Sequence, residues 1–117
     1  MPGDSARSKS DRAGKIRFLN DAFRRDHSLG VVVLTQGVAA LGPQAVNNLL
    51  SEVAQFDGFC AENDPYGEHD FGSLTFDGTQ VFWKIDYFDQ AMQMHSPNPA
   101  DIALTRRVLT LLMADEY

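Results

Sequence analysis

The sequence has a single cysteine, Cys60, among its 117 residues. One cysteine cannot form an internal disulfide, so the composition gives no sign of an oxidising compartment. Long hydrophobic runs are also lacking. The run at residues 31–34 is far shorter than the roughly 20 apolar residues that cross a bilayer. The polar N-terminus shows no apolar segment typical of a signal peptide. We therefore expect a cytoplasmic protein with no membrane segment.

Basic residues are scarce in the middle of the chain. Residues 28–89 contain one, Lys84, against nine acidic residues, which gives this block a net charge of −8. Residues 1–27 carry +3 and residues 90–117 carry −1, so the whole chain has a net charge of −6. Binding to nucleic acid requires Lys and Arg to neutralise phosphates. The balance of charge therefore argues against direct binding to nucleic acid as the main function.

Several familiar binding motifs are missing. The sequence has no phosphate-binding Walker loop, no Gly-x-Gly-x-x-Gly fingerprint, no paired cysteines and no EF-hand loop. We therefore predict no cofactor and no bound metal. Hydrophobic residues make up 44 % of the chain, as in an ordinary globular protein. Residues 1–12 are polar without an apolar period and are predicted to be a disordered tail, so that residues 13–117 form a single domain.

The spacing of apolar residues predicts an α+β fold with the element order α-β-α-β-β-α. Residues 31–35 are apolar and mostly β-branched, which is typical of a central strand buried on both faces. The hairpin and this strand would form a small antiparallel sheet covered by three helices. A fourth strand could come from 37–41 or 59–62. The predicted elements are a helix over 11–26, a strand over 31–35, a helix over 43–56, hairpin strands over 71–77 and 79–88, and a last helix from Asn98 that includes Met113.

The hairpin has a predictable register. Asp77-Gly78 lies between two alternating apolar runs, which is a strong signal for a two-residue turn. Phe76 would then pair with Thr79, and counting outward places His69 opposite Asp86. Directly opposed side chains lie roughly 4.5–5.5 Å apart, so His69 and Asp86 should be neighbours. The core face would carry Leu74, Phe76, Val81, Trp83, Ile85 and Tyr87.

The run from Asn63 to Gly72 is the candidate site, and three interpretations compete. In the structural one, His69 and Asp86 hold the loop in place. In the catalytic one, His69 and Asp86 are an acid–base pair whose nucleophile is Ser73, Thr75, Cys60 or a water molecule. In the metal-binding one, His69 joins nearby carboxylates. The candidate binding residues are Asp64, Glu68, His69, Asp70, Asp86 and Asp89.

Two runs, Gly67-Glu68-His69-Asp70-Phe71-Gly72 and Trp83-Lys84-Ile85-Asp86-Tyr87, carry a family resemblance. Together with shorter runs between Ile16 and Tyr117, they resemble a family of small bacterial proteins known only as a domain of unknown function. The resemblance supplies no activity. It implies a protein carried on plasmids and other mobile elements, near genes that counter host defence.

Three functions are therefore open. The first is a non-catalytic acidic binding protein that inhibits a bacterial defence system, such as CRISPR or restriction, by binding a protein or by mimicking nucleic acid. The alternative is a small metal-dependent hydrolase or nuclease that uses His69 and Asp86. A third is an assembly module, since Phe71, Phe82 and Phe88 make one hairpin face aromatic enough to bind a second copy. We expect a protein partner, with a homodimer as one option.

Overall fold

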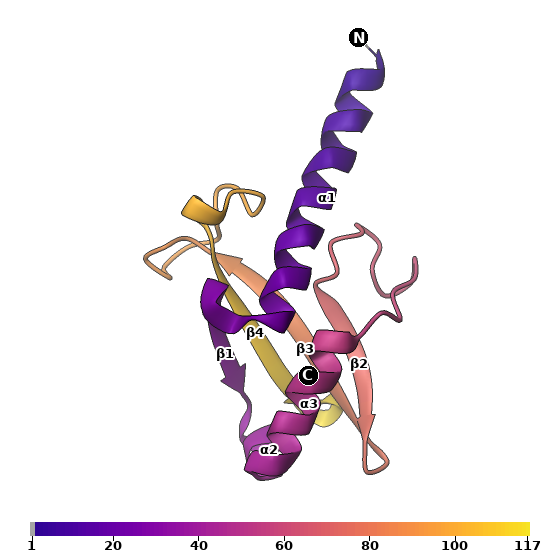
Figure 1. Cartoon of the computed structure of the whole chain (residues 1–117), viewed down its shortest axis with the longest axis vertical. Coiled ribbons are helices and arrows are strands. Elements are labelled where there is room, and N and C mark those ends of the chain that lie inside the picture. The colour runs from indigo at the N-terminus through magenta and orange to yellow at the C-terminus, as the bar shows by residue number, and fades with distance from the viewer. Residues whose placement is uncertain (1) are drawn as a thin grey trace.

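A computed structural model describes residues 2–117, with side chains from residue 11 onward. Four strands form one sheet in the order β1-β4-β3-β2 (Figure 1). β1 runs parallel to β4, whereas the β3–β4 and β2–β3 pairs are antiparallel. The bounds are Pro2–Arg25 for α1, Gly30–Leu34 for β1, Gln36–Ala39 for α2, Pro43–Gln55 for α3, Phe71–Phe76 for β2, Thr79–Phe88 for β3 and Arg106–Met113 for β4, with short 3₁₀ turns η1 at His27–Leu29, η2 at Ile102–Leu104 and η3 at Ala114–Glu116.

The hairpin register is confirmed for all six pairs of β2 and β3, from Phe76 with Thr79 to Phe71 with Lys84. Asp77 and Gly78 have φ values of 48° and 78°. Positive φ at both central residues is the geometry of the tight turn that suits the strand twist. The core face is also as predicted. Val81, Trp83, Ile85 and Tyr87 are buried, and Leu74 and Phe76 pack against them.

The last predicted helix is wrong, because residues 106–113 form β4, a central strand between β1 and β3. Its apolar residues face both sides of the sheet, and such a continuous run can be taken for a buried helix. Asn98 and Asp101, expected at the start of that helix, instead form side-chain hydrogen bonds in a turn and at the start of a 3₁₀ helix. Asn98 accepts a hydrogen bond from the amide of Ala100, and Asp101 accepts one from the amide of Ala103 at the start of η2.

The strand predicted to be central is an edge strand. β1 pairs only with β4 among the described strands, and Val33 in it is 44 % exposed. The parallel β1–β4 pair makes the sheet mixed rather than antiparallel. It depends on Gly30, because a Cβ atom there would clash with the carbonyl of Arg107. Residues 37–41 and 59–62, expected to supply a fourth strand, contain α2 and part of a loop.

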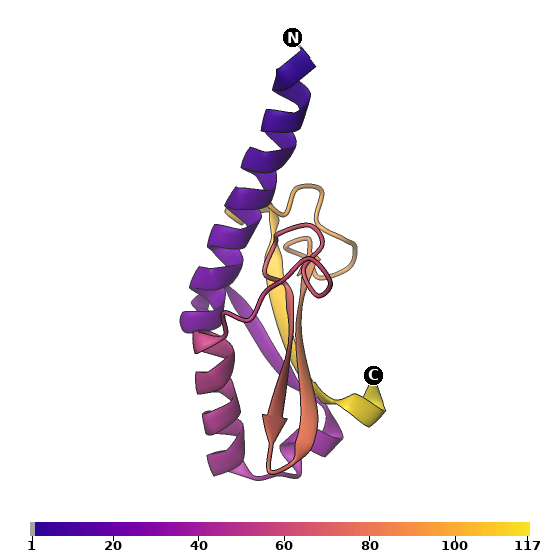
Figure 2. The ribbon, with the colours of Figure 1, turned by 90° about the vertical axis from the view of Figure 1, so that its right-hand side faces the viewer.

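Two helices, α1 and α3, cover one face of the sheet, and the opposite face carries neither of them. The 3₁₀ turn η3 lies on that opposite side, where Tyr117 packs on Phe71 and Phe82 (Figure 2). Buried residues of these helices, including Ile16, Phe23, Leu49 and Val53, complete the core with β3 and β4. Helix α1 continues past the sheet and includes residues 2–12, for which a disordered tail was expected (Figure 1). The domain boundary at residue 12 stays a prediction.

No helix within residues 2–117 is both long and apolar enough to cross a membrane.

Candidate functional site

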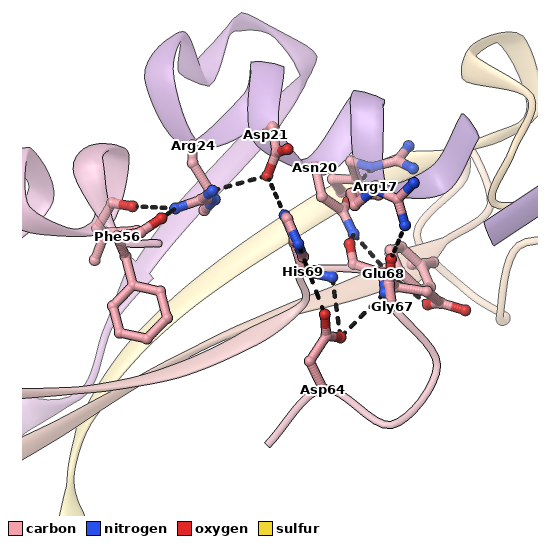
Figure 3. A network of polar contacts seen from close by, with 12 residues as sticks. Arg17, Asn20, Asp21, Arg24, Phe56, Asp64, Gly67, Glu68 and His69 are labelled. Carbon is pink, nitrogen blue, oxygen red and sulfur yellow. Dashed lines mark hydrogen bonds and ion pairs between the residues drawn. The ribbon is translucent and has the colours of Figure 1, made fainter. Parts of the chain in front are cut away.

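The candidate site is the loop over residues 57–70, which leads from α3 to β2 and is tied to α1 (Figure 3). Arg17 on α1 donates to the carbonyl of Gly67 at 2.8 Å, and Asn20 donates to the carbonyl of Glu68 at 2.9 Å. The next residue of the helix, Asp21, faces the ring of His69. Two adjacent turns of α1 therefore hold three successive residues of the loop.

His69 lies between two carboxylates. Its Nδ1 is 2.9 Å from Asp21 and its Nε2 is 3.8 Å from Asp64, while its ring stacks on Phe59 with the centroids 3.7 Å apart. The residue has a φ of 57°, so the chain leaves strand geometry at this point. An acid–base histidine needs one ring nitrogen free to face substrate. Here both nitrogens face carboxylates of the fold, which favours the structural interpretation of His69.

Asp64 shapes the turn that presents His69. The residue is buried, and its Oδ1 accepts hydrogen bonds from the amides of Glu68 and His69 at 3.0 and 3.1 Å. A short polar side chain that binds amides four and five residues ahead replaces the bonds that a strand would supply. Asp64 is thus a loop-holding residue, with the carboxylate turned inward.

Asp21 joins the histidine to a buried arginine. Burial raises the pKa of Asp21, but hydrogen bonds from Arg24 and His69 outweigh it and lower that pKa overall. Arg24 also donates to the carbonyls of Val53 and Phe56 at 2.6 and 3.0 Å. The ionised carboxylate of Asp21 stabilises the folded state at every pH above its lowered pKa. The bonds from Asp21 to Arg24 and His69 therefore weaken only in acid.

A second branch of the network passes through the core. Asn20 is fully buried. It donates to the hydroxyl of Tyr87 at 2.8 Å and accepts from Nε of Arg107 at 2.7 Å. Tyr87 in turn donates to the carboxylate of Glu68 at 2.8 Å. Burial lowers the pKa of Arg107 and raises that of Tyr87. The chain of bonds connects α1, the loop, β3 and β4 without contact between Arg107 and a carboxylate.

The predicted contact between His69 and Asp86 is wrong. Asp86 alternates along β3 with the buried Ile85 and Tyr87, so its side chain lies on the face without helices, where it pairs with Lys84 at 3.5 Å. His69 turns to the helix-covered face and meets Asp21. The register holds only as far as Asp70, whose carbonyl accepts from the amide of Ile85. The positive φ at His69 then ends it.

The remaining candidates fall into separate places. Asp70 and Asp86 line one pocket of about 360 Å³ together with His95. Asp89 lies in the following loop and accepts from the amides of Gln93 and Met94. Within the part of the chain that is described, no three His, Cys, Asp or Glu residues are placed to hold a metal ion. The proposed nucleophiles Cys60, Ser73 and Thr75 are all exposed.

Sequence reasoning missed the α1 side of the site: Asn20, Asp21 and Arg24. A signal was present, because Ile16, Asn20 and Arg24 are spaced by four residues and Phe23 lies beside them. Residues at this spacing share one helix face. Ile16 and Phe23 lie on the apolar face of this helix, which packs in the core. Asn20 and Arg24 lie on the same face and are therefore buried with them. Polar residues on a buried stripe indicate bonds to another segment.

Asp70 gives a testable pH dependence. Burial, followed by the charges of Glu68, Asp64 and Asp86, raises the pKa of Asp70 to about 6. The folded state then holds this proton more tightly than the unfolded state, in which the pKa is about 3.9. The resulting stability is complete below about pH 4 and is lost as the pH rises to about 6.

Asp70→Asn cannot ionise, so we expect it to unfold at higher urea concentration than the wild type at pH 7.5. Because the group is partly exposed and screened, we expect a gain of about 1 kcal/mol. The difference should disappear near pH 4. Glu52→Gln, at an exposed position on α3, is the control and should show no such pH dependence. An equal effect of Asp70→Asn at both pH values would contradict the prediction.

Comparisons with known proteins place the chain in a family. The model of the family DUF3768, described as a protein of unknown function, matches residues 34–116, which include the 57–70 loop and all of β2, β3 and β4. The matched region begins after α1 and most of β1, later than the resemblance from Ile16 suggested. No curated protein and no solved structure matched the chain. A match over more than half of the chain shows that it belongs to the DUF3768 family.

Proposed function

We propose that this chain is a non-catalytic binding protein that offers an acidic surface to a basic site on a partner protein. The observation that carries the proposal is how the carboxylates divide. Asp21 and Asp64 face inward and are bonded to the fold, whereas Glu52, Asp57 and Glu62 near the end of α3 are exposed. Exposed carboxylates in a block of net charge −8 attract basic surfaces and speed their encounter.

A basic groove that binds nucleic acid is the partner chemistry that fits best. Such a groove is built to receive a line of negative charges, and an acidic surface competes for it. In its sharper form, the proposal is that the protein is a cytoplasmic bacterial inhibitor of a defence system such as CRISPR or restriction. It would act by binding the nuclease or by mimicking its nucleic acid. The expectation, drawn from the resemblance, that such proteins are carried on mobile elements motivates this form.

The hydrolase or nuclease alternative loses the residue pair on which it was based. Asp86 and His69 lie on opposite faces of the sheet, and both ring nitrogens of His69 face carboxylates. The same residues are accounted for by their bonds to the fold.

The test is capture of partners from a nuclease-treated bacterial lysate at 50 and 500 mM NaCl. We expect a nucleic-acid-binding protein that is retained at low salt and released at high salt or by heparin, a soluble polyanion. Asp57→Asn/Glu62→Gln should weaken capture. The control Asp11→Asn/Asp115→Asn, which also removes two exposed charges, should not. Capture that ignores salt, or no nucleic-acid-binding protein among the captured ones, would contradict the proposal.

A further inference from the structure

The sequence around β1 is free of charge, and the carboxylate that the structure brings to its C-terminal end, Glu116, is bonded to Thr35 and Gly37. Residues 28–51 include β1, α2 and most of α3, and they contain no Asp, Glu, Lys or Arg. Even the exposed residues of α3 in this stretch are uncharged: Pro43, Gln44, Asn47, Asn48 and Ser51. An exposed helix face normally carries charged residues. In a chain of net charge −6, a continuous uncharged stretch is the place where another molecule of the same charge can approach.

The outer edge of β1 offers unpaired backbone groups. The amide of Thr35 donates to the carbonyl of Leu111 on β4. The backbone groups of successive strand residues point in alternate directions. The amide and carbonyl groups of Val31 and Val33 therefore also face β4, and the amide and carbonyl groups of Gly30, Val32 and Leu34 point outward. The amide of Gly30 donates to the carbonyl of His27, whereas the outward groups of Val32 and Leu34 have no backbone partner within residues 2–117. β1 forms the left-hand edge of the sheet in Figure 1.

This edge also lacks the usual protection. Native sheets guard their edges with lysine, proline, bulges or a covering segment, because a bare edge pairs with other strands. β1 consists of one glycine, three valines and one leucine, and Val33 is 44 % exposed on the face without helices. A five-residue apolar edge without a charge is a template for strand pairing.

We propose that two copies of this chain pair antiparallel along β1 and join their sheets into one of eight strands. Centred on Val32, the pairing sets Val32 against its copy, so that both of its outward backbone groups bond. It sets Gly30 against Leu34, so that the amide of Leu34 donates to the carbonyl of Gly30, whose own amide stays bonded to His27. Val31 then lies opposite Val33 of the copy, so the exposed valine gains a β-branched neighbour. The arrangement is isologous and closed, and it does not depend on the acidic binding function.

Charge distinguishes this edge from the other one. β2 is also uncharged, but Asp70 precedes it and Asp77 follows it. Antiparallel pairing of β2 with its copy would set Asp70 near Asp77 at both ends, and opposed like charges destabilise a strand pair. The residues that flank β1, from Ser28 to Gln36, carry no charge. A second copy is therefore accommodated along β1 and repelled along β2.

The test compares Val33→Lys with Thr75→Lys in the full chain. Both positions are exposed on the face without helices, in β1 and β2 respectively. Sedimentation equilibrium at 5–200 µM should give the wild type and Thr75→Lys twice the chain mass of 13.0 kDa. We expect Val33→Lys to raise the dimer dissociation constant at least tenfold. Hydrogen exchange of the Val32 and Leu34 amides should be slow in the dimer and fast in Val33→Lys.

Circular dichroism and the urea midpoint establish that both variants fold. If Val33→Lys does not fold, the amide exchange of Val32 and Leu34 in the wild type, measured against concentration, decides the question. A wild-type chain that is monomeric at 200 µM would overturn the proposal. So would a dimer that survives Val33→Lys and is lost in Thr75→Lys, or one in which the Val32 amide exchanges freely.

Discussion

Replacing Arg24 with methionine is expected to lower the free energy of unfolding by about 3–5 kcal/mol, the cost of removing one partner from a buried charged network. The side chain is 3 % exposed and lies over the rings of Phe59 and Trp83, 5.3 and 5.2 Å from their centroids. Its guanidinium binds two carbonyls at the C-terminal end of α3 and the carboxylate of Asp21. Methionine fills similar space but supplies none of these bonds.

The expected cost is large because two helix ends meet at this point. The C-terminal end of α1, which carries Arg24, lies against the C-terminal end of α3, and each helix end carries a partial negative charge (Figure 2). Removing the cation leaves carbonyls of Val53 and Phe56 without this donor and Asp21 without its strongest partner. Two ends of like sign would then face each other across the core.

Urea unfolding of Arg24→Met, monitored by tryptophan fluorescence, measures this effect, because Trp83 is the one tryptophan of the chain. A fall in the melting temperature on the order of 10 °C or more is expected. The neighbouring Arg25→Met is the control, since Arg25 is exposed and its loss should change stability by less than about 0.5 kcal/mol. Similar results for the two variants would show that the bonds of Arg24 add little.

The elements that the sequence predicts well are those whose signals are local. Helix α3 begins at Pro43 as expected and ends at Gln55, one residue before the predicted end. The β2–β3 hairpin follows from one turn dipeptide and from the alternation of its flanks. In both cases each residue interacts mainly with neighbours a few positions away, so the pattern is sufficient evidence.

The sheet order is a different kind of information. β4 is buried on both faces, and its apolar residues therefore show no period of two that would mark a strand. Predicting a helix over this segment also made the predicted sheet order wrong, because β4 is the strand that pairs with both β1 and β3. With β4 lost, β1 could only be assigned to the centre of the sheet, although it lies at the edge.

The sequence predicted only part of the candidate site, because only part of it has a local signal. The Asn63–Gly72 run stood out by composition, and the structure uses Asp64, Glu68 and His69 together. Their partners on α1 are 48 residues away from the loop in sequence. No local pattern specifies which distant polar residue completes such a bond. The face of α1 could have been predicted from its spacing, but its pairing with the loop could not.

Asn20→Ala is expected to cost about 2–4 kcal/mol, more than a surface substitution by an order of magnitude. Asn20 is fully buried. Its side chain binds the carbonyl of Glu68, the hydroxyl of Tyr87 and Nε of Arg107. Alanine leaves Nε of Arg107 buried without this acceptor. A buried charged group that lacks its hydrogen-bond partner destabilises the fold by more than an ordinary hydrogen bond between neutral groups stabilises it. Asn47→Ala, on the exposed face of α3, is the matched control.

A double-mutant cycle with Tyr87→Phe separates the network from simple loss of packing. Tyr87 accepts from Asn20 and donates to Glu68, so its hydroxyl loses one of its two partners once Asn20 is replaced. If the bonds act together, the two substitutions should be less costly combined than the sum of the single ones, by about 0.5–3 kcal/mol. Additive costs would mean that Asn20 stabilises the core through Arg107 and the carbonyl of Glu68, and not through Tyr87. Coupling would instead show that the bond between Asn20 and Tyr87 stabilises the fold, and that β3 is tied to a helix that lies outside the matched family region.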